Sequence, residues 1–189
     1  MAMINLAHFI PCSVSEGPGK RAVIWVQGCH LDCEGCCNPE LQSFRPATLC
    51  DIEELIEKIV EAKRNHDIEG ITLLGGEPML QAQGLALLAE ACQSFKLSVM
   101  IFTGFTLNML KQQSLLGSER LLNATDLLVD GPYLRRKPET ERNWCGSTNQ
   151  QFHYLTDRYQ PSIETDPRFQ PSIEVGVSLE QVRISGYPS

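Results

Sequence analysis

Three cysteines with short, regular spacing are the most reactive group of residues in this sequence. Cys29, Cys33 and Cys36 form a C-x3-C-x2-C run that follows the apolar segment 22–26. Three thiolates so close in the chain can converge on one metal centre, and soft thiolate ligands suit zinc or an iron–sulfur cluster. Structural zinc sites usually take four protein ligands in two separated pairs, and no second pair stands out here. The spacing therefore favours an iron–sulfur cluster in which one iron is left free for a small molecule.

The other cysteines do not share this spacing. Cys37 directly follows Cys36, and two adjacent thiols cannot easily reach one cluster, so we expect Cys37 to be a bystander, with ligand exchange or redox sensitivity as the alternative. His30 lies inside the run and is expected to be a solvated loop residue rather than a ligand. The remaining thiols are scattered: Cys12, Cys50, Cys92 and Cys145. Of these, Cys92 lies on the apolar side of a predicted helix and is expected in the core.

A second group of candidate residues follows later strands. The segment Gly75-Gly76-Glu77-Pro78 alone predicts only a tight turn. Together with the cysteine run it indicates a cofactor site, because glycines let the backbone approach a ligand and a carboxylate suits a cation. Thr103 and Asp130 end two further predicted strands and are candidates for the same site, with an ordinary role in a turn as the equal alternative. Asn38, just after the cysteine run, is also counted among the candidate cofactor contacts.

The predicted elements place these residues at strand ends. Strands are predicted at 22–27, 70–74, 97–103 and 126–130, and helices at 51–64, 81–95 and 106–116. Asp51 is predicted to cap the first helix, with Glu54 completing a capping box. This alternation is typical of an α/β fold with mostly parallel strands. Beyond Asp130 the sequence predicts a long polar loop at 131–146 and two short strand-like segments at 173–177 and 181–185.

Composition narrows the classes of protein that fit. The 189 residues suffice for one domain with a proper core but not for a complete (β/α)8 barrel. A net charge of −7 argues against non-specific binding to nucleic acid. No apolar run is long enough to span a bilayer and no signal-peptide pattern is seen, so we expect a cytoplasmic protein without a membrane partner. In that compartment eight cysteines indicate metal or redox chemistry rather than disulfides.

Four motifs together make the sequence similar to the radical S-adenosylmethionine superfamily. They are the cysteine run, Gly75-Gly76-Glu77-Pro78, Asp130-Gly131-Pro132-Tyr133 and Gly146-Ser147-Thr148-Asn149-Gln150. Within the superfamily the chain most resembles the small activating enzymes, especially those of anaerobic ribonucleoside-triphosphate reductase. The resemblance covers Gly17 to about Phe152. It implies one domain over 1–189, a partial open (β/α) barrel of the radical SAM type with its core at about 17–152 and a C-terminal extension at about 153–189.

The resemblance also implies the cofactors. Cys29, Cys33 and Cys36 would hold a 4Fe-4S cluster whose fourth iron is chelated by S-adenosylmethionine. The ammonium group of that cofactor would be received by Gly75, Gly76 and Glu77. An electron from the cluster would cleave the sulfonium to methionine and a 5′-deoxyadenosyl radical. The implied partners are a larger glycyl radical enzyme, such as an anaerobic ribonucleotide reductase, and a flavodoxin or ferredoxin as electron donor.

Some residues depart from the family pattern. Gly35 stands where many members have an aromatic residue, although the activating group accepts glycine there. Cys145 and Gln151 stand on either side of the Gly146–Gln150 motif, where arginine is common. The changes at Cys145 and Gln151 motivate one alternative, radical modification of a peptide or small molecule. A second alternative, of another class, is an iron–sulfur electron-transfer module without radical chemistry. The basic run at 135–137 is expected to be merely exposed, with docking of an acidic partner as its alternative.

Overall fold

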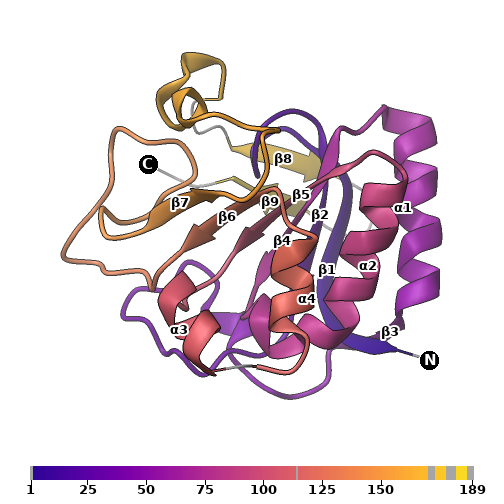
Figure 1. Ribbon diagram of the computed structural model, residues 1–189, viewed down its shortest axis with the longest axis horizontal. Coiled ribbons are helices and arrows are strands. Elements are labelled where there is room, and N and C mark those ends of the chain that lie inside the picture. Colours follow the sequence, from indigo (N-terminus) through magenta and orange to yellow (C-terminus); the bar gives the residue numbers. More distant parts are fainter. Residues whose placement is uncertain (1, 114, 170–172, 178–181, 187–189) are drawn as a thin grey trace.

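The structure is a computed structural model that describes residues 2–113, 115–169, 173–177 and 182–186. Seven strands form one open sheet in the order β3-β1-β2-β4-β5-β6-β7 (Figure 1). Their bounds are β1 (Met3–Ser13), β2 (Arg21–Val26), β3 (Thr48–Asp51), β4 (Gly70–Gly75), β5 (Ser98–Phe102), β6 (Leu127–Asp130) and β7 (Gln151–Tyr154). Strands β2, β4, β5 and β6 are parallel to one another, whereas β1, β3 and β7 pair antiparallel.

The mixed α/β architecture with a parallel centre is confirmed, and the three antiparallel strands are additions to the prediction. β1 and β3 extend the sheet beyond β2, and β7 extends it beyond β6. In β1 the buried residues Ile4 and Leu6 alternate with more exposed neighbours, as expected for a strand with two different faces. β3 has only four residues and buries only Cys50, so its pairing with β1 leaves little trace in the sequence.

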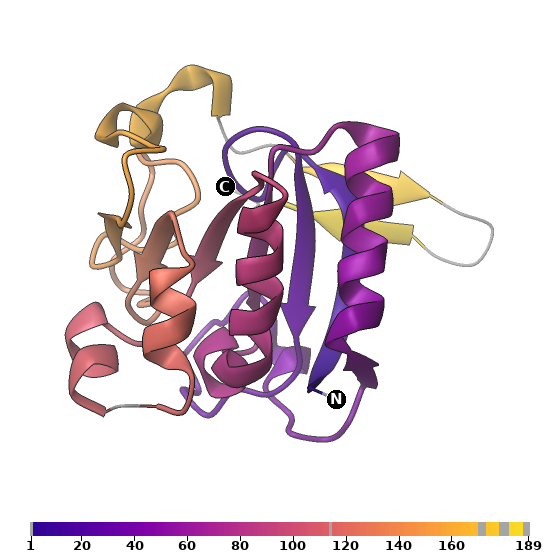
Figure 2. The same ribbon diagram turned by 45° about the vertical axis from the view of Figure 1, so that its right-hand side comes forward.

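Four helices connect or follow these strands: α1 (Ile52–His66), α2 (Ala82–Ser94), α3 (Leu107–Gln113) and α4 (Ser118–Asn123). Helices α1, α2 and α4 lie side by side on one face of the sheet (Figures 1 and 2). Asp51 caps α1 as predicted, because its carboxylate accepts the backbone N–H of Glu53 at 2.8 Å. The capping box does not form, since Glu54 instead pairs with Lys58 at 2.7 Å.

The helix predicted at 106–116 is shorter than expected. α3 ends at Gln113, and a separate helix, α4, begins at Ser118. Gly117 between them has φ +84°, which no helix interior accommodates. A Cβ at Gly117 would lie 2.6 Å from the backbone of Gln83, so the chain turns here against α2. The break therefore follows from packing between helices.

Apolar side chains of the sheet alternate between two faces. On the face covered by helices, strand residues such as Leu73 and Ile101 pack with Leu55 and Leu88. Cys92 is buried in this core, as predicted. On the opposite face, β5 and β6 pack against Trp144 and Cys145. The segment after β6 thus crosses to the face of the sheet that lies opposite the helices.

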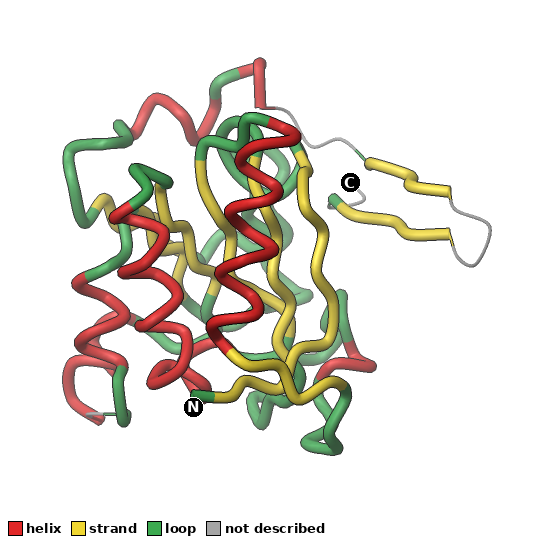
Figure 3. The backbone as a smooth tube through the Cα atoms, turned by 90° about the vertical axis from the view of Figure 1, so that its right-hand side faces the viewer, coloured by secondary structure: helices red, strands yellow, loops and turns green. Residues whose placement is uncertain are grey.

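The C-terminal part contains two 3-10 helices, η3 (Pro161–Thr165) and η4 (Pro167–Phe169), and the strands β8 (Glu174–Val177) and β9 (Val182–Ser185). β8 and β9 confirm the two predicted strand-like segments, and they pair antiparallel with each other in a small sheet that stands apart from the main sheet (Figure 3). The carboxylate of Glu174, on β8, accepts hydrogen bonds from the backbone N–H of Val14 and from the N–H and hydroxyl of Ser15. No described helix is both long and apolar enough to span a bilayer.

Candidate metal and cofactor site

One open cavity lies where the parallel strands β2, β4, β5 and β6 end. Its walls come from the loops that follow these strands and from the turn at 15–16. It brings together eight of the predicted site residues: Cys29, Cys33, Cys36, Asn38, Gly75, Gly76, Glu77 and Thr103. These residues come from three separate loops, and the parallel sheet places the loops at one edge. Pro78 and Asp130 are not among the residues that line this cavity.

The cysteine loop, residues 29–36, curls around the cavity. Asp32 and Gly35 have φ +45° and +76°, and Gly28 just before the loop has φ +104°. These left-handed positions reverse the chain within a few residues, so all three predicted thiols line the cavity, and all three are free. Burial raises the pKa of Cys29 and of Cys33 above the ordinary thiol value.

The arrangement of the thiols bears on the kind of metal. In the described part of the chain, no three His, Cys, Asp or Glu side chains are grouped to hold a single metal ion. A mononuclear zinc would need its thiolates within about 2.3 Å of one point. Three free thiols that line one cavity are the ligand set of a polynuclear iron–sulfur cluster, whose cysteines bind different irons. Cys37 also lines the cavity, and desolvation, followed by the neighbouring Cys36, raises its thiol pKa to about 11.

The predicted glycine turn packs directly against the start of the cysteine loop. A Cβ at Gly76 would lie 2.4 Å from the carbonyl oxygen of Gly28, closer than any real contact. The N–H of Glu77 donates to that same oxygen at 2.9 Å, and the N–H of Gly76 donates to Val26 at 2.7 Å. Only a residue without a side chain allows the ends of β2 and β4 to approach in this way.

Glu77 ties the loop after β4 to the loop after β5. Its carboxylate is buried and accepts hydrogen bonds from the hydroxyl of Thr103 at 2.7 Å and the N–H of Gly104 at 2.8 Å. A third bond comes from the N–H of Met79, which caps the 3-10 helix η2 (Pro78–Gln81). Burial raises the pKa of Glu77 to about 7, although these three donors oppose the shift. Pro78 is buried at the first position of η2.

Asp130 ends β6, but its carboxylate serves the start of α3. It accepts the N–H of Leu107 at 2.5 Å, and its Oδ2 lies 2.8 Å from Nε2 of His153 on β7. The sequence offered no partner for His153, because the antiparallel pairing of β6 with β7 decides this contact. The next residue, Gly131, does line the cavity.

The long loop predicted at 131–146 is confirmed, because residues 131–150, which we call the cover segment, form no helix or strand. The segment folds back on itself at the bridge between Pro138 and Ser147 and contributes Tyr133, Trp144 and Gln150 to the cavity wall. The side chain of Gln150 accepts the N–H groups of Gly146 and Ser147 at 2.9 and 3.1 Å. The signal in the sequence was the density of Ser, Asn and Gln in the Gly146–Gln150 motif, since these side chains bond to nearby backbone.

Two departures from the family pattern stand on either side of the Gly146–Gln150 motif. Cys145, itself part of the cover segment, is buried in the core, and Gln151 is exposed on β7. Neither lines the cavity. An arginine three residues before Cys145 reaches the motif instead, since Arg142 donates to the carbonyl of Gln150 at 3.0 Å.

Comparison with known proteins identifies the family of this chain. The profile of the family described as "4Fe-4S single cluster domain" matches residues 15–153, which include all of the predicted site residues. The chain belongs to this family. Its curated relatives include the anaerobic ribonucleoside-triphosphate reductase-activating proteins of Vibrio cholerae (30% identity; 81% of this chain, 99% of the relative) and Enterobacteria phage T4 (30%; 82% and 96%). The Escherichia coli K12 protein of the same name is 26% identical over 80% of this chain and 99% of its own length. The resemblance inferred from the motifs is thus confirmed.

Proposed function

We propose that this chain is a radical S-adenosylmethionine enzyme that installs a glycyl radical on a larger partner, such as an anaerobic ribonucleotide reductase. One observation carries the proposal. Three free thiols of a single loop and the Gly75–Glu77 turn line the same cavity, in a chain that belongs to a 4Fe-4S family. The names of the relatives supply the partner class. When bound and reduced by an external donor, the cluster would supply the one electron that cleaves the sulfonium of S-adenosylmethionine into methionine and a 5′-deoxyadenosyl radical, and that radical would take a hydrogen atom from a glycine of the partner.

In this proposal the chain's own residues hold and orient the cofactors. Cys29, Cys33 and Cys36 bind three irons. Gly75 and Gly76 let the ammonium end of the cofactor approach the backbone. Glu77 lies in the cavity wall with a pKa near 7, and a bound ammonium would favour its ionised form.

Four further residues have smaller parts. Thr103 holds the Glu77 carboxylate in place through its 2.7 Å hydrogen bond, and Pro78 begins the short helix that Glu77 caps. Asn38 lines the cavity beside the cysteine loop. Asp130 acts indirectly, because its carboxylate holds the start of α3.

We further propose that the open sheet is a partial (β/α) barrel whose inner face carries the cavity. The cavity side chains Leu74 and Phe102 pack with the residues on the sheet face opposite the helices. A radical needs protection from water, and a large partner docked over the open side would provide it. The electron donor would be a flavodoxin or ferredoxin, and the compartment the cytoplasm.

The same geometry gives no support to the alternative of a peptide or small-molecule substrate. Modification of a peptide or small molecule was motivated by Cys145 and Gln151, but neither residue lines the cavity. The electron-transfer alternative predicts that S-adenosylmethionine leaves the spectrum of the cluster unchanged. Adding S-adenosylmethionine to the reduced protein therefore separates an electron-transfer module from a radical enzyme.

The first experiment is an anaerobic reconstitution with iron and sulfide, followed by reduction and addition of S-adenosylmethionine. We expect 5′-deoxyadenosine from the wild type and from Cys37→Ala, and none from Cys33→Ala. The two variants remove one thiol each from the same cavity wall, so only the cluster ligands separate them. An intact cluster that leaves S-adenosylmethionine uncleaved, with and without a candidate partner, contradicts the proposal.

The second experiment tests the partner. The reduced protein and S-adenosylmethionine are mixed with an anaerobic ribonucleotide reductase, and the glycyl radical is sought by electron paramagnetic resonance. We expect the signal with the wild type and not with Cys33→Ala. Cleavage without a glycyl signal would leave the radical chemistry standing and refute this choice of partner.

A further inference from the structure

One arginine of the basic run at 135–137 lies against the cysteine loop. A Cβ built on Gly35 would be 3.2 Å from Cδ of Arg135 and 3.6 Å from the ring of Tyr133. Gly35 stands between Cys33 and Cys36, so the cover segment touches the loop in the middle of its thiols. Arg135 and Gly35 are 100 positions apart in the sequence, so only the fold brings them together.

The same two segments also meet at the cavity. Tyr133 and Cys33 both line it, and the ring of Tyr133 lies near Gly35. The stretch 133–135 thus approaches the cysteine loop at the glycine between Cys33 and Cys36.

The backbone around Arg135 is held in place on both sides. The N–H of Leu134 donates to the hydroxyl of Ser147 at 3.1 Å, and the N–H of Lys137 closes a turn onto the carbonyl of Leu134 at 2.8 Å. The carbonyl of Lys137 in turn accepts the N–H of Thr148 at 2.8 Å. The Gly146–Gln150 motif therefore positions the arginine, which gives this motif a physical role.

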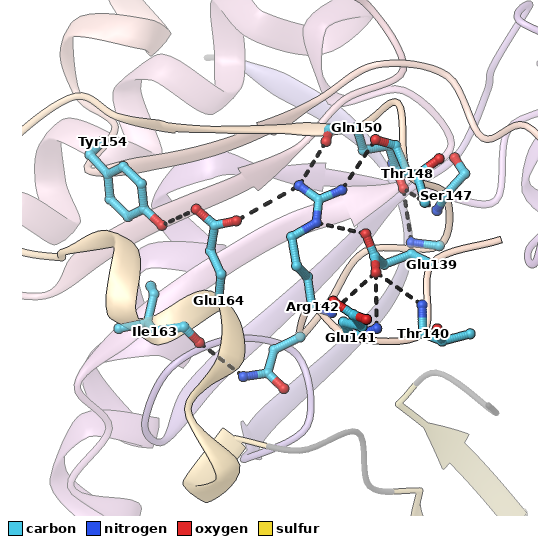
Figure 4. A network of polar contacts seen from close by, with 12 residues as sticks. Glu139, Thr140, Glu141, Arg142, Ser147, Thr148, Gln150, Tyr154, Ile163 and Glu164 are labelled. Carbon is cyan, nitrogen blue, oxygen red and sulfur yellow. Dashed lines mark hydrogen bonds and ion pairs between the residues drawn. The ribbon is translucent and has the colours of Figure 1, made fainter. Parts of the chain in front are cut away.

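Arg142 holds that motif (Figure 4). Its guanidinium donates to the carbonyls of Gln150 and Thr148 at 3.0 and 3.4 Å, and it pairs with Glu139 at 2.7 Å. Glu164 on η3 lies 3.7 Å from it and joins the C-terminal part to the network. The position of Arg135 is thus fixed by a connected set of bonds rather than by its own side chain.

Within the part of the chain that the structure describes, the charge of Arg135 has no close ionic partner. Among the ion pairs between described residues, none includes Arg135, Arg136 or Lys137. The stem of Arg135 covers the glycine while the residue as a whole stays exposed. Arg136, the next residue, carries the same charge and is also exposed, but none of the three atoms nearest to a Cβ on Gly35 belongs to it.

We propose that Arg135 tunes the cluster electrostatically, raising its reduction potential so that it accepts an electron more readily. A cluster held by three thiolates becomes more negative when reduced, and a nearby cation stabilises that state. The inference rests on the proposed placement of the cluster at Cys29, Cys33 and Cys36. It does not require that S-adenosylmethionine be cleaved.

The test compares Arg135→Gln with Arg136→Gln, which remove the same charge from adjacent positions. Both holoproteins are checked for iron content and then titrated potentiometrically, with the reduced cluster followed by electron paramagnetic resonance. We expect the midpoint of Arg135→Gln to shift to more negative potential, and that of Arg136→Gln to shift much less. The difference should narrow at high salt, because exposed charges are screened.

A third variant separates charge from packing. Arg135→Lys keeps the cation and should stay close to the wild-type midpoint. Three results would overturn the inference. The midpoint of Arg135→Gln could be unchanged, it could shift as much as that of Arg136→Gln does, or the midpoint of Arg135→Lys could shift as much as that of Arg135→Gln. A wild-type protein that binds no cluster overturns both proposals, whereas the expected midpoints without any 5′-deoxyadenosine would refute the proposed function and leave the tuning intact.

Discussion

The contact between Gly76 and Gly28 makes a prediction whose size follows from the structure. In Gly76→Ala the new Cβ would stand 2.4 Å from the carbonyl oxygen of Gly28, and also within 3.0 Å of its carbonyl carbon and nitrogen. Ordinary van der Waals contact begins near 3.4 Å, so the start of the cysteine loop has to retreat by about 1 Å. No side-chain rotation relieves this overlap, because all three of these atoms are backbone.

Two costs follow. Overpacking of this kind destabilises a protein by about 1–3 kcal/mol. The displaced carbonyl also loses its 2.9 Å bond from the N–H of Glu77, worth about 1 kcal/mol. We therefore expect Gly76→Ala to lower the free energy of unfolding by about 2–4 kcal/mol. Because the shift falls on the residue before Cys29, iron retention should fall as well.

A matched variant makes the test specific. A Cβ at Gly104 would overlap Leu31 by a similar amount, with its nearest contact at 2.3 Å, but that atom is the tip of a side chain. Leu31 can rotate away, so Gly104→Ala should cost less than about 1 kcal/mol. Urea denaturation of the two reduced apoproteins under anaerobic conditions measures both values.

The reasoning fails on two outcomes. One is Gly76→Ala within about 0.5 kcal/mol of the wild type, the range of an ordinary surface substitution. The other is Gly104→Ala as unstable as Gly76→Ala, which would mean that the rigidity of the neighbour does not decide the cost.

Three other predictions follow from the site. Cys36→Ala should lose most of its reconstituted iron and its visible absorption, whereas Cys37→Ala should match the wild type in a colorimetric iron assay; equal losses would place Cys37 among the ligands. The folded pKa of Glu77, about 7, lies above its ordinary value of 4.5, so the apoprotein should lose about 3 kcal/mol of stability as pH rises from about 4.5 to 7. Urea denaturation across that range measures the loss, and Glu77→Gln should flatten it; a parallel slope in the variant would assign the effect to other groups. Arg142→Met removes the bonds that hold the cover segment and leaves Glu139 without its ion pair. We therefore expect the free energy of unfolding to fall by about 2–4 kcal/mol and proteolysis within 131–150 to become faster. Arg168→Met, at an exposed ion pair, should change neither quantity.

The parts of this protein that local chemistry controls were predictable from the sequence. Three cysteines within eight residues lie close whatever the rest of the chain does, and Asp51 caps its helix through a bond to a residue two positions on. The alternation of strands and helices also made Gly75 and Thr103 candidates for the site of the thiols, because parallel strands end at the same edge, and both residues line the cavity.

The remaining features depend on which distant segments meet, and short-range patterns carry no information on that choice. The antiparallel strands β1, β3 and β7 exist through their partners. Pairing of β6 with β7 brings His153 within 2.8 Å of Asp130, whose carboxylate holds the start of α3. Residue types and spacing were enough to predict the chemistry of the thiols and the edge of the sheet at which they lie. The contact of Arg135 in the cover segment with Gly35 could not be predicted in this way, because a contact across 100 residues is selected by packing over the whole chain.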